Sequence, residues 1–264
     1  MFNPKLVPYA VWSGDANRTA VGNIWMAADV PSPQLGNTRN VFIYLPPGYT
    51  HSRKRYPVLY MHDGQNLIDA QTSFAGTEWG VDETLESLGK TRAKPQVEAI
   101  VVGLWNTAAR KEEYMPFRVG WNGTGPSYLA FLTDTIKPWI DDRFRTKPGA
   151  ETTVIMGSSL GGLISMYAAF NRPDVFGLCA ALSPALWPGN GEIMRRISAS
   201  EGGPGKVYVD WGTREPSGRR VVDLLLSKGY AHGSTLKFVS EQGGQHNEAA
   251  WSRRFPGAVS FLLG

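Results

Sequence analysis

The stretch that decides the fold of this 264-residue chain reads Thr152-Thr153-Val154-Ile155-Met156-Gly157-Ser158-Ser159-Leu160-Gly161-Gly162. Its β-branched start predicts a strand, and the apolar spacing over residues 163–170 predicts a helix directly after it. Between them lies Gly-x-Ser-x-Gly, centred on Ser159. A strand, a sharp turn and a helix in this order are typical of a nucleophile elbow, which lifts one serine hydroxyl above a sheet. Centring the pattern on Ser158 would put Met156 and Leu160 at the glycine positions, where their side chains would crowd the turn.

Segments typical of strands recur along the whole chain, at residues 23–27, 39–45, 56–61, 97–103, 152–156, 177–182, 207–211 and 235–239. Helical patterns lie at about 80–89, 126–143, 160–171, 191–199, 217–229 and 247–263. The early strands follow one another without helices, whereas the later ones alternate with helices, which implies parallel crossovers. The sequence therefore predicts a single α/β domain over residues 1–264. We expect a mostly parallel eight-stranded sheet with helices on both faces.

The net charge of +4 is scattered along the chain, and the densest basic cluster is His51-Ser52-Arg53-Lys54-Arg55, just before a predicted strand. No basic stripe with interleaved aromatic residues accompanies it, which argues against a nucleic-acid partner. No apolar stretch reaches the length needed to span a membrane. We therefore expect neither a nucleic acid nor a membrane as a partner.

Cys179 is the single cysteine, which excludes an internal disulfide framework and an all-cysteine metal site. Its apolar neighbours predict an inert core thiol. The first residues, Met1-Phe2-Asn3-Pro4-Lys5, lack the charged and apolar regions of a signal peptide. A cytoplasmic chain and a mature exported chain both stay open, as does the oligomeric state, a homo-oligomer included.

A serine hydroxyl is a poor nucleophile near neutral pH and needs a base to take its proton. Among the four histidines, His246 comes directly after the last predicted strand and before the final helix. In a parallel sheet this is the carboxyl edge, where Ser159 also lies. We predict His246 as the base, the alternative being a helix-capping or core histidine. His62 also ends a strand at this edge and is the next candidate.

The base needs a carboxylate that fixes its tautomer and stabilises the imidazolium. In hydrolases with a nucleophile elbow this acid follows the serine and precedes the histidine in the chain. Glu215 lies in the loop after the strand at residues 207–211, from which it can reach the histidine. Asp210 is still within that strand, so we favour Glu215 over Asp210.

The tetrahedral intermediate carries an oxyanion that needs two backbone donors. One is expected from the N–H of Leu160, directly after the nucleophile. The other should come from the turn Met61-His62-Asp63-Gly64-Gln65-Asn66, where Gly64 permits a close approach and the Gln65 N–H is our choice. Asp63 and His62 would hold this loop through hydrogen bonds.

Together these motifs resemble the putative-esterase branch of the α/β-hydrolase fold. That branch includes feruloyl and acetyl-xylan esterases, siderophore trilactone esterases, S-formylglutathione hydrolases and mycolyltransferases. The matching motifs are Tyr56-Pro57-Val58-Leu59-Tyr60-Met61-His62-Asp63-Gly64-Gln65-Asn66, Gly157-Ser158-Ser159-Leu160-Gly161-Gly162, Gly212-Thr213-Arg214-Glu215, Gly244-Gln245-His246-Asn247-Glu248 with Trp251, and Glu113-Tyr114-Met115-Pro116. The resemblance runs from about residue 35 to the end and implies the same nucleophile, base and oxyanion donors. Many members carry aspartate where Glu215 falls.

Aromatic residues gather in the aperiodic stretch 105–126, where Trp105, Tyr114, Phe117 and Trp121 lie, and Trp187 and Trp251 follow later. Of these we predict Trp105, Tyr114, Trp187 and Trp251 to line a substrate site, because aromatic walls suit an aryl-acyl group. Arg110, Lys111 and Arg118 could meet an anionic substrate or form a solvated loop. The sequence leaves open whether the stretch forms a mobile lid.

We thus expect a serine carboxylic-ester hydrolase that acts on small aryl or acyl esters, feruloyl- or acetyl-type included. No cofactor or metal motif is present in the sequence. A siderophore trilactone esterase is the alternative within enzymes, and a non-catalytic binding module is the alternative outside them.

Overall fold

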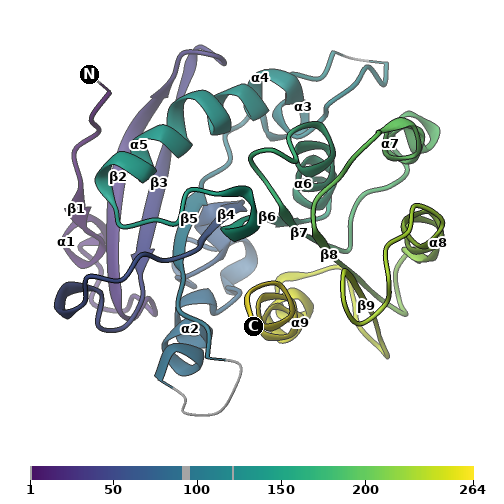
Figure 1. The fold of residues 1–264 in the computed structure, drawn as a ribbon. Coiled ribbons are helices and arrows are strands. Elements are labelled where there is room, and N and C mark those ends of the chain that lie inside the picture. The colour runs from purple at the N-terminus through teal and green to yellow at the C-terminus, as the bar shows by residue number, and fades with distance from the viewer. Residues whose placement is uncertain (1, 91–95, 121) are drawn as a thin grey trace.

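The computed structural model describes residues 2–90, 96–120 and 122–264, which form a central twisted sheet covered by helices on both faces (Figure 1). The sheet has nine strands in the order β1-β2-β3-β5-β4-β6-β7-β8-β9. Their bounds are β1 Val7–Pro8, β2 Asn23–Ser32, β3 Asn37–Leu45, β4 Val58–His62, β5 Ile100–Leu104, β6 Thr153–Ser158, β7 Leu178–Leu182, β8 Lys206–Gly212 and β9 Leu236–Glu241.

Strand direction divides the sheet into two parts. Each neighbouring pair from β1 to β5 is antiparallel, whereas all pairs from β5 through β4, β6, β7 and β8 to β9 are parallel. This agrees with the order in the sequence, because helices separate the later strands and supply the crossovers that parallel pairing requires. The carboxyl ends of β4, β6, β7, β8 and β9 therefore meet at one edge of the sheet.

The helices have bounds α1 Tyr9–Ser13, α2 Val81–Lys90, α3 Arg110–Glu113, α4 Gly125–Ala130, α5 Lys137–Arg143, α6 Leu160–Asn171, α7 Pro188–Ala199, α8 Arg219–Ser227 and α9 Glu248–Leu263. A π-helical segment, η4 (Phe131–Ile136), joins α4 to α5, and short 3₁₀ segments lie at η1 Tyr49–His51, η2 Gly64–Asn66, η3 Phe74–Gly76 and η5 Ala150–Thr152. In the described ranges, no helix combines the length and apolar character that a membrane crossing requires.

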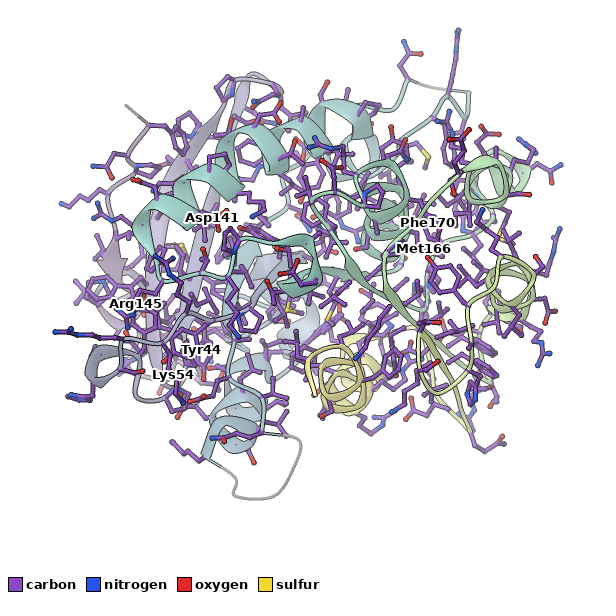
Figure 2. The ribbon with its side chains drawn as sticks, viewed as in Figure 1. Tyr44, Lys54, Asp141, Arg145, Met166 and Phe170 are labelled. Carbon is purple, nitrogen blue, oxygen red and sulfur yellow. The ribbon has the colours of Figure 1, made fainter. Side chains whose placement is uncertain are left out.

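Two apolar cores lie on opposite faces of the sheet. The first is formed with α4, η4, α5, α6, α7 and α8, and it contains Met166 and Phe170 of α6 (Figure 2). The second is formed with α1, α2 and α9 (Figure 1). The free thiol of Cys179 is fully buried in the first core, and this burial raises its pKa. Helix α6 is buried along nearly its whole length, so the segment after Ser159 is fixed by packing on every side.

The prediction of eight strands is wrong by one. The ninth strand is β1, whose two residues pair with Met26 and Trp25 of β2. A strand of two residues is too short to show an alternation of polar and apolar residues. It forms only because it pairs with the neighbouring strand, so its own sequence does not predict it.

The aperiodic stretch is more ordered than the sequence suggested. It contains α3, and residues 113–117 within it are buried. Glu113 anchors this stretch to the sheet through a buried ion pair with Arg39 of β3, at 2.9 Å. Trp121 lies outside the described residues.

Candidate active site

Ser159 lies on the sharp turn between β6 and α6. Its backbone has φ 56° and ψ −121°, a conformation that L-residues rarely adopt and that is found where the surrounding structure enforces it. Two backbone hydrogen bonds fix the turn to the end of β7: Ser159 N–H donates to the Leu182 carbonyl (3.0 Å), and Ala185 N–H donates to the Ser159 carbonyl (2.9 Å). The residue that the pattern selects is thus held in the strained geometry of an elbow.

The glycines around Ser159 are required by close packing. A Cβ atom at Gly157 would lie 2.8 Å from the backbone carbon of Gly161 and 2.9 Å from the His62 ring. Such distances are too short for carbon atoms, so any side chain at Gly157 would push the turn away from the strand below it. His62 therefore forms the floor of the elbow.

His246 is placed by the loop between β9 and α9, and its imidazole contacts Glu215. The distance from His246 Nδ1 to Glu215 Oε2 is 2.6 Å, with the imidazole 44% exposed and the carboxylate 3% exposed. Burial opposes ionisation of Glu215, but hydrogen bonds from His246, Ser183 and Gly212 outweigh it and lower its pKa. Because Glu215 is then an anion without a proton to give, Nδ1 carries the proton, and in the neutral imidazole Nε2 is left as an acceptor.

Ser159 and His246 line the same two cavities. Among the residues that the structure describes, Ser159 makes no hydrogen bond to His246 at or below 3.5 Å. In hydrolases without a substrate such bonds are often long and shorten in the complex. The site therefore contains the two side chains that a proton transfer requires, without a hydrogen bond between Ser159 and His246.

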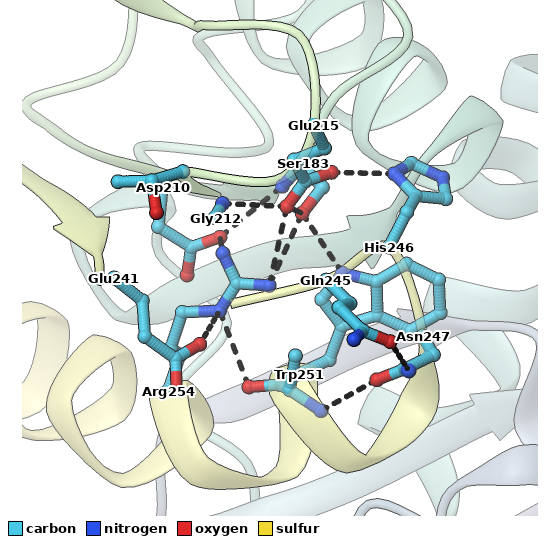
Figure 3. A network of polar contacts seen from close by, with 12 residues as sticks. Ser183, Asp210, Gly212, Glu215, Glu241, Gln245, His246, Asn247, Trp251 and Arg254 are labelled. Atoms are coloured by element: carbon cyan, nitrogen blue, oxygen red, sulfur yellow. Dashed lines mark hydrogen bonds and ion pairs between the residues drawn. The ribbon is translucent and has the colours of Figure 1, made fainter. Parts of the chain in front are cut away.

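The other oxygen of Glu215 is held by donors from two strand ends. Glu215 Oε1 accepts from the Gly212 N–H at the end of β8 (2.6 Å) and from the Ser183 hydroxyl after β7 (2.7 Å) (Figure 3). Asp210, the alternative acid, is fully buried and faces elsewhere: its Oδ1 lies 2.9 Å from Arg254 Nη1 and accepts from the Ser183 N–H. The structure thus brings Glu215 rather than Asp210 to the histidine.

The turn after β4 carries the expected second oxyanion donor. Asp63 adopts φ 56° and starts the 3₁₀ segment that contains Gln65. The Asp63 carboxylate forms a two-pronged ion pair with Arg110, at 2.7 Å to Nε and 2.8 Å to Nη2, and accepts from Asn106 Nδ2 at 2.6 Å. Arg110 therefore fastens this turn and is not a free cation of a solvated loop.

The backbone N–H groups of both expected oxyanion donors, Leu160 and Gln65, donate to no backbone or side-chain acceptor in the described part of the chain. Leu160 is the first residue of α6, so its N–H points out of the helix start. Gln65 lines the same cavity as Ser159 and His246.

His62 has a structural environment. It is almost fully buried, and its Nδ1 lies 2.8 Å from the Tyr128 hydroxyl. Burial lowers its pKa to about 3, so it is neutral at physiological pH. Beneath the elbow it cannot reach a substrate as the base would have to.

The first cavity, of about 480 Å³, is mainly apolar. Its walls come from the segment after β7 and from the start of α7 and α8: Ser183, Pro184, Ala185, Leu186, Trp187, Asn190, Gly191, Met194, Glu215, Pro216, Ser217 and Arg220. Trp187 is 69% exposed, so its indole is available to a ligand at the mouth of this cavity. Trp187 thus lines a cavity that contains Ser159, and its role in substrate binding stays a prediction.

The second cavity, of about 430 Å³, is lined mostly by polar and charged residues. It is lined by Asp63, Gln65, Asn66, Phe74, Asn106, Arg110, Ser158, Glu248 and Trp251 in addition to Ser159 and His246. Trp251 packs edge-on against the His246 ring, with centroids 5.1 Å apart. Burial raises the pKa of Glu248.

Two of the aromatic residues expected in the substrate site lie elsewhere. Tyr114 is fully buried, and its hydroxyl accepts from the Asp63 N–H at 3.2 Å, so the prediction that it lines the site is wrong. Its packing against His62 and Tyr128 makes it part of the support beneath the oxyanion turn. Trp105 packs edge-on against Trp12 and lines neither cavity, so the same prediction is wrong for Trp105.

In the described ranges, one group of carboxylates is close enough to share a cation. It consists of Glu78, Asp82 and Glu83, whose oxygens lie within 4.8 Å of one another. None of the three lines either cavity.

The comparison with known proteins decides the family. A family model described as "Putative esterase" matches residues 32–262. The chain belongs to this esterase family. It is therefore an enzyme that hydrolyses carboxylic esters, with an α/β-hydrolase fold.

Three relatives illustrate the family. The chain is 26% identical to the uncharacterized protein YbbA of Bacillus subtilis, over 90% of this chain and 98% of that protein. It is 28% identical to an endo-1,4-beta-xylanase/feruloyl esterase of Xylanibacter ruminicola, over 84% of this chain but 29% of the relative. Among solved structures, the ferric enterobactin esterase of Salmonella typhimurium superposes with a TM-score of 0.72 at 22% identity, over 92% of this chain and 59% of that one. This last likeness concerns the fold.

Sequence reasoning missed two residues that hold the acid. Ser183 and Arg254 both contact Glu215 or its partners (Figure 3). Ser183 has φ 43°, which no sequence pattern shows. Arg254 and the exposed Arg253 are adjacent arginines on the last helix. Adjacent residues of a helix point in different directions, so the helical period could have indicated that only one of the two is exposed.

Proposed function

We propose that this esterase works through an acyl-enzyme on Ser159, with His246 as general base and acid and Glu215 as the residue that orients His246. The observation that carries the proposal is the 2.6 Å contact between Glu215 Oε2 and His246 Nδ1. It leaves Nε2 as the acceptor in a ring that lines the same cavities as the strained serine.

In the acylation step, Ser159 Oγ attacks the ester carbonyl carbon while its proton moves to His246 Nε2. The carbonyl π electrons move to oxygen, and the N–H groups of Leu160 and Gln65 stabilise the oxyanion. The intermediate collapses, the bond to the alkoxy oxygen breaks, and His246 returns the proton to the leaving alcohol. Glu215 stabilises the imidazolium that forms between these events.

Deacylation repeats the sequence with water. His246 takes a proton from water as the water oxygen attacks the acyl carbon. His246 then gives this proton to the Ser159 oxygen as the bond from that oxygen to the acyl carbon breaks. The acid product and the free serine result, so atoms and charges balance without a further reactant.

We propose small aryl or acyl esters, feruloyl- or acetyl-type, as the substrate class. The apolar cavity beside Ser159 and the exposed indole of Trp187 support an aromatic or short acyl group on that side. The polar and charged residues that line the second cavity support a hydroxylated alcohol on the other side.

A siderophore trilactone is the second candidate substrate. The enterobactin esterases among the relatives and structural neighbours favour it. So does Arg220 at the wall of the first cavity, whose guanidinium forms no ion pair within the described residues and could meet an anionic catecholate.

Covalent labelling tests the nucleophile. A fluorophosphonate probe should label the wild-type protein once, and Ser159→Ala should lose both the label and ester turnover. Ser158→Ala is the control for the label: Ser158 is the adjacent serine, which also lines the second cavity, and its loss should leave the label on Ser159 in place. Labelling of Ser159→Ala at the wild-type rate would refute the assignment.

An ester panel tests the substrate class. We expect turnover of methyl ferulate and p-nitrophenyl acetate by the purified protein. Turnover of p-nitrophenyl acetate with none of methyl ferulate would exclude the aryl-acyl preference. A higher kcat/KM for a catecholate trilactone than for any ferulate ester would favour the second candidate.

A further inference from the structure

Arg254 of α9 lies beneath the candidate triad and is 5% exposed. Its guanidinium faces three carboxylates: Nη1 lies 2.9 Å from Asp210 Oδ1, Nη2 lies 3.6 Å from Glu215 Oε1, and Nε lies 3.3 Å from Glu241 Oε2 (Figure 3). A buried guanidinium that lies close to several carboxylates at once is constrained in position, since moving it away would leave buried charges unpaired.

Ser183 connects this guanidinium to the acid. The Ser183 hydroxyl oxygen accepts from Arg254 Nη2 at 3.2 Å and from Trp251 Nε1 at 3.0 Å. Both of those groups can only donate, so they occupy the two lone pairs of the hydroxyl. Its single proton is therefore committed to Glu215 Oε1, at 2.7 Å.

This arrangement makes the two oxygens of Glu215 unequal. Oε1 is surrounded by the Ser183 hydroxyl, the Gly212 N–H and the Arg254 guanidinium. Oε2 contacts His246. The carboxylate cannot rotate without giving up donors on the Oε1 side, so the oxygen that faces the imidazole is fixed.

We propose that Arg254 is a positioning residue of the esterase: acting directly and through Ser183, it holds Glu215 by Oε1 so that Oε2 orients His246. This inference rests on the proposed triad. It also gives Asp210 a role, as the buried counter-ion that fixes the other end of the guanidinium.

Other charged groups lie around Arg254 and the Glu215–His246 pair. Asp210 comes from β8, Glu241 from the end of β9, Glu248 from the start of α9 and Arg220 from α8. Asp210, Glu215 and Glu241 all lie close to the Arg254 guanidinium, so Arg254 is a buried cation that offsets these carboxylates from below. Replacing it by a neutral side chain favours proton uptake by the Glu215–His246 pair, and the acid limb of kcat/KM should move to higher pH.

Four variants separate these effects. Arg254→Lys keeps the positive charge but loses the planar guanidinium that donates in several directions, and Arg254→Gln loses both. Ser183→Ala removes the hydroxyl that connects Arg254 to Glu215 without a change in charge. Arg253→Gln is the matched control, because Arg253 is the adjacent arginine, pairs with Glu241 and is 57% exposed. Turnover is measured per active site, titrated with a fluorophosphonate, so that unfolded protein does not count.

We expect Arg254→Lys and Ser183→Ala to lower kcat per titrated site at least fivefold with KM nearly unchanged. Arg254→Gln should in addition move the acid limb to higher pH, and Arg253→Gln should retain wild-type values. Smaller losses in both Arg254→Lys and Ser183→Ala would overturn the inference, and if Arg254→Lys does not fold, Ser183→Ala decides alone. Wild-type turnover by His246→Ala would overturn the proposed function as well, which distinguishes the two failures.

Discussion

Glu215→Gln should impair the enzyme more than Glu215→Ala, although glutamine is the closer replacement. Two donors, the Gly212 N–H and the Ser183 hydroxyl, meet Oε1. They will select the carbonyl oxygen of the glutamine amide for that position. The amide nitrogen then faces His246 Nδ1, where it can only donate. The imidazole must accept at Nδ1 and carry its proton on Nε2, which removes the base that faces the serine.

The magnitude follows from the contact that is lost. A charge-assisted hydrogen bond in a buried setting contributes about 1.5–3 kcal/mol, which is about 10- to 150-fold in rate. Glu215→Ala loses this contribution. Water can then hydrogen-bond to the His246 imidazole, which is 44% exposed, and no protein group imposes the wrong tautomer on it. Glu215→Gln also imposes the wrong tautomer, so we expect a loss of about 10³-fold, somewhat less than the loss of about 10⁴-fold in kcat that the corresponding Asp→Asn replacement causes in a serine-protease triad.

The assay is kcat/KM for p-nitrophenyl acetate between pH 5 and 9, with each variant checked for folding by circular dichroism. His246→Ala sets the lower limit, at a loss of several orders of magnitude. If Glu215→Gln proves as active as Glu215→Ala or more active, the assignment of donors around Oε1 is wrong.

Three further predictions concern other parts of the chain. Burial raises the pKa of Asp82 to about 9, so the folded state retains a proton that the unfolded chain releases near pH 4, and stability falls as pH rises between these values. Asp82→Asn should remove this slope, up to about 1.4 kcal/mol per pH unit in urea unfolding at pH 5–8. The exposed Asp223→Asn is the control, and parallel profiles for Asp82→Asn and wild type would contradict the reasoning. Gly64→Ala would place a Cβ 2.7 Å from the backbone of Gly103, so the turn that carries Gln65 must shift. We expect kcat to fall and the free energy of unfolding to decrease by about 1–3 kcal/mol. An unchanged kcat would argue against Gln65 as an oxyanion donor. Trp187→Ala should raise KM for aryl esters several-fold. The indole is 69% exposed, so Tm should stay within about 1 °C of the wild-type value. An equal rise in KM for acetyl esters would contradict the proposed role of Trp187 in aryl binding.

The fold could be predicted from the sequence wherever the signal was local. The elbow at Ser159 and the alternation of strands and helices after it depend on nearest neighbours in the chain. Strand β2 was predicted too short, because it continues past an irregularity between Ala27 and Val30 and through Pro31. Pairing with β3 carries it further, and such pairing has no trace in the sequence of one strand.

The site was predictable in its separate groups but not in its support. Glu215 could be chosen over Asp210 because its position in the loop gave it reach. Tyr114 was misplaced, because an aromatic residue in an aperiodic stretch looks the same in sequence whether it is buried or exposed. Arg254 escaped notice because its carboxylate partners come from β8, from the loop after β8 and from the end of β9, and only the folded sheet brings them together.

The two cavities share Ser159 and His246 and, in the described part of the chain, no other wall residue. One is built by the segments after β7 and β8, the other by the turn after β4 and the start of α9. If the first cavity receives the acid and the second the alcohol, as proposed above, changes in one set of segments alter which acid the enzyme accepts and leave its choice of alcohol intact. Each half of the site can then be selected on its own while Ser159 and His246 stay the same.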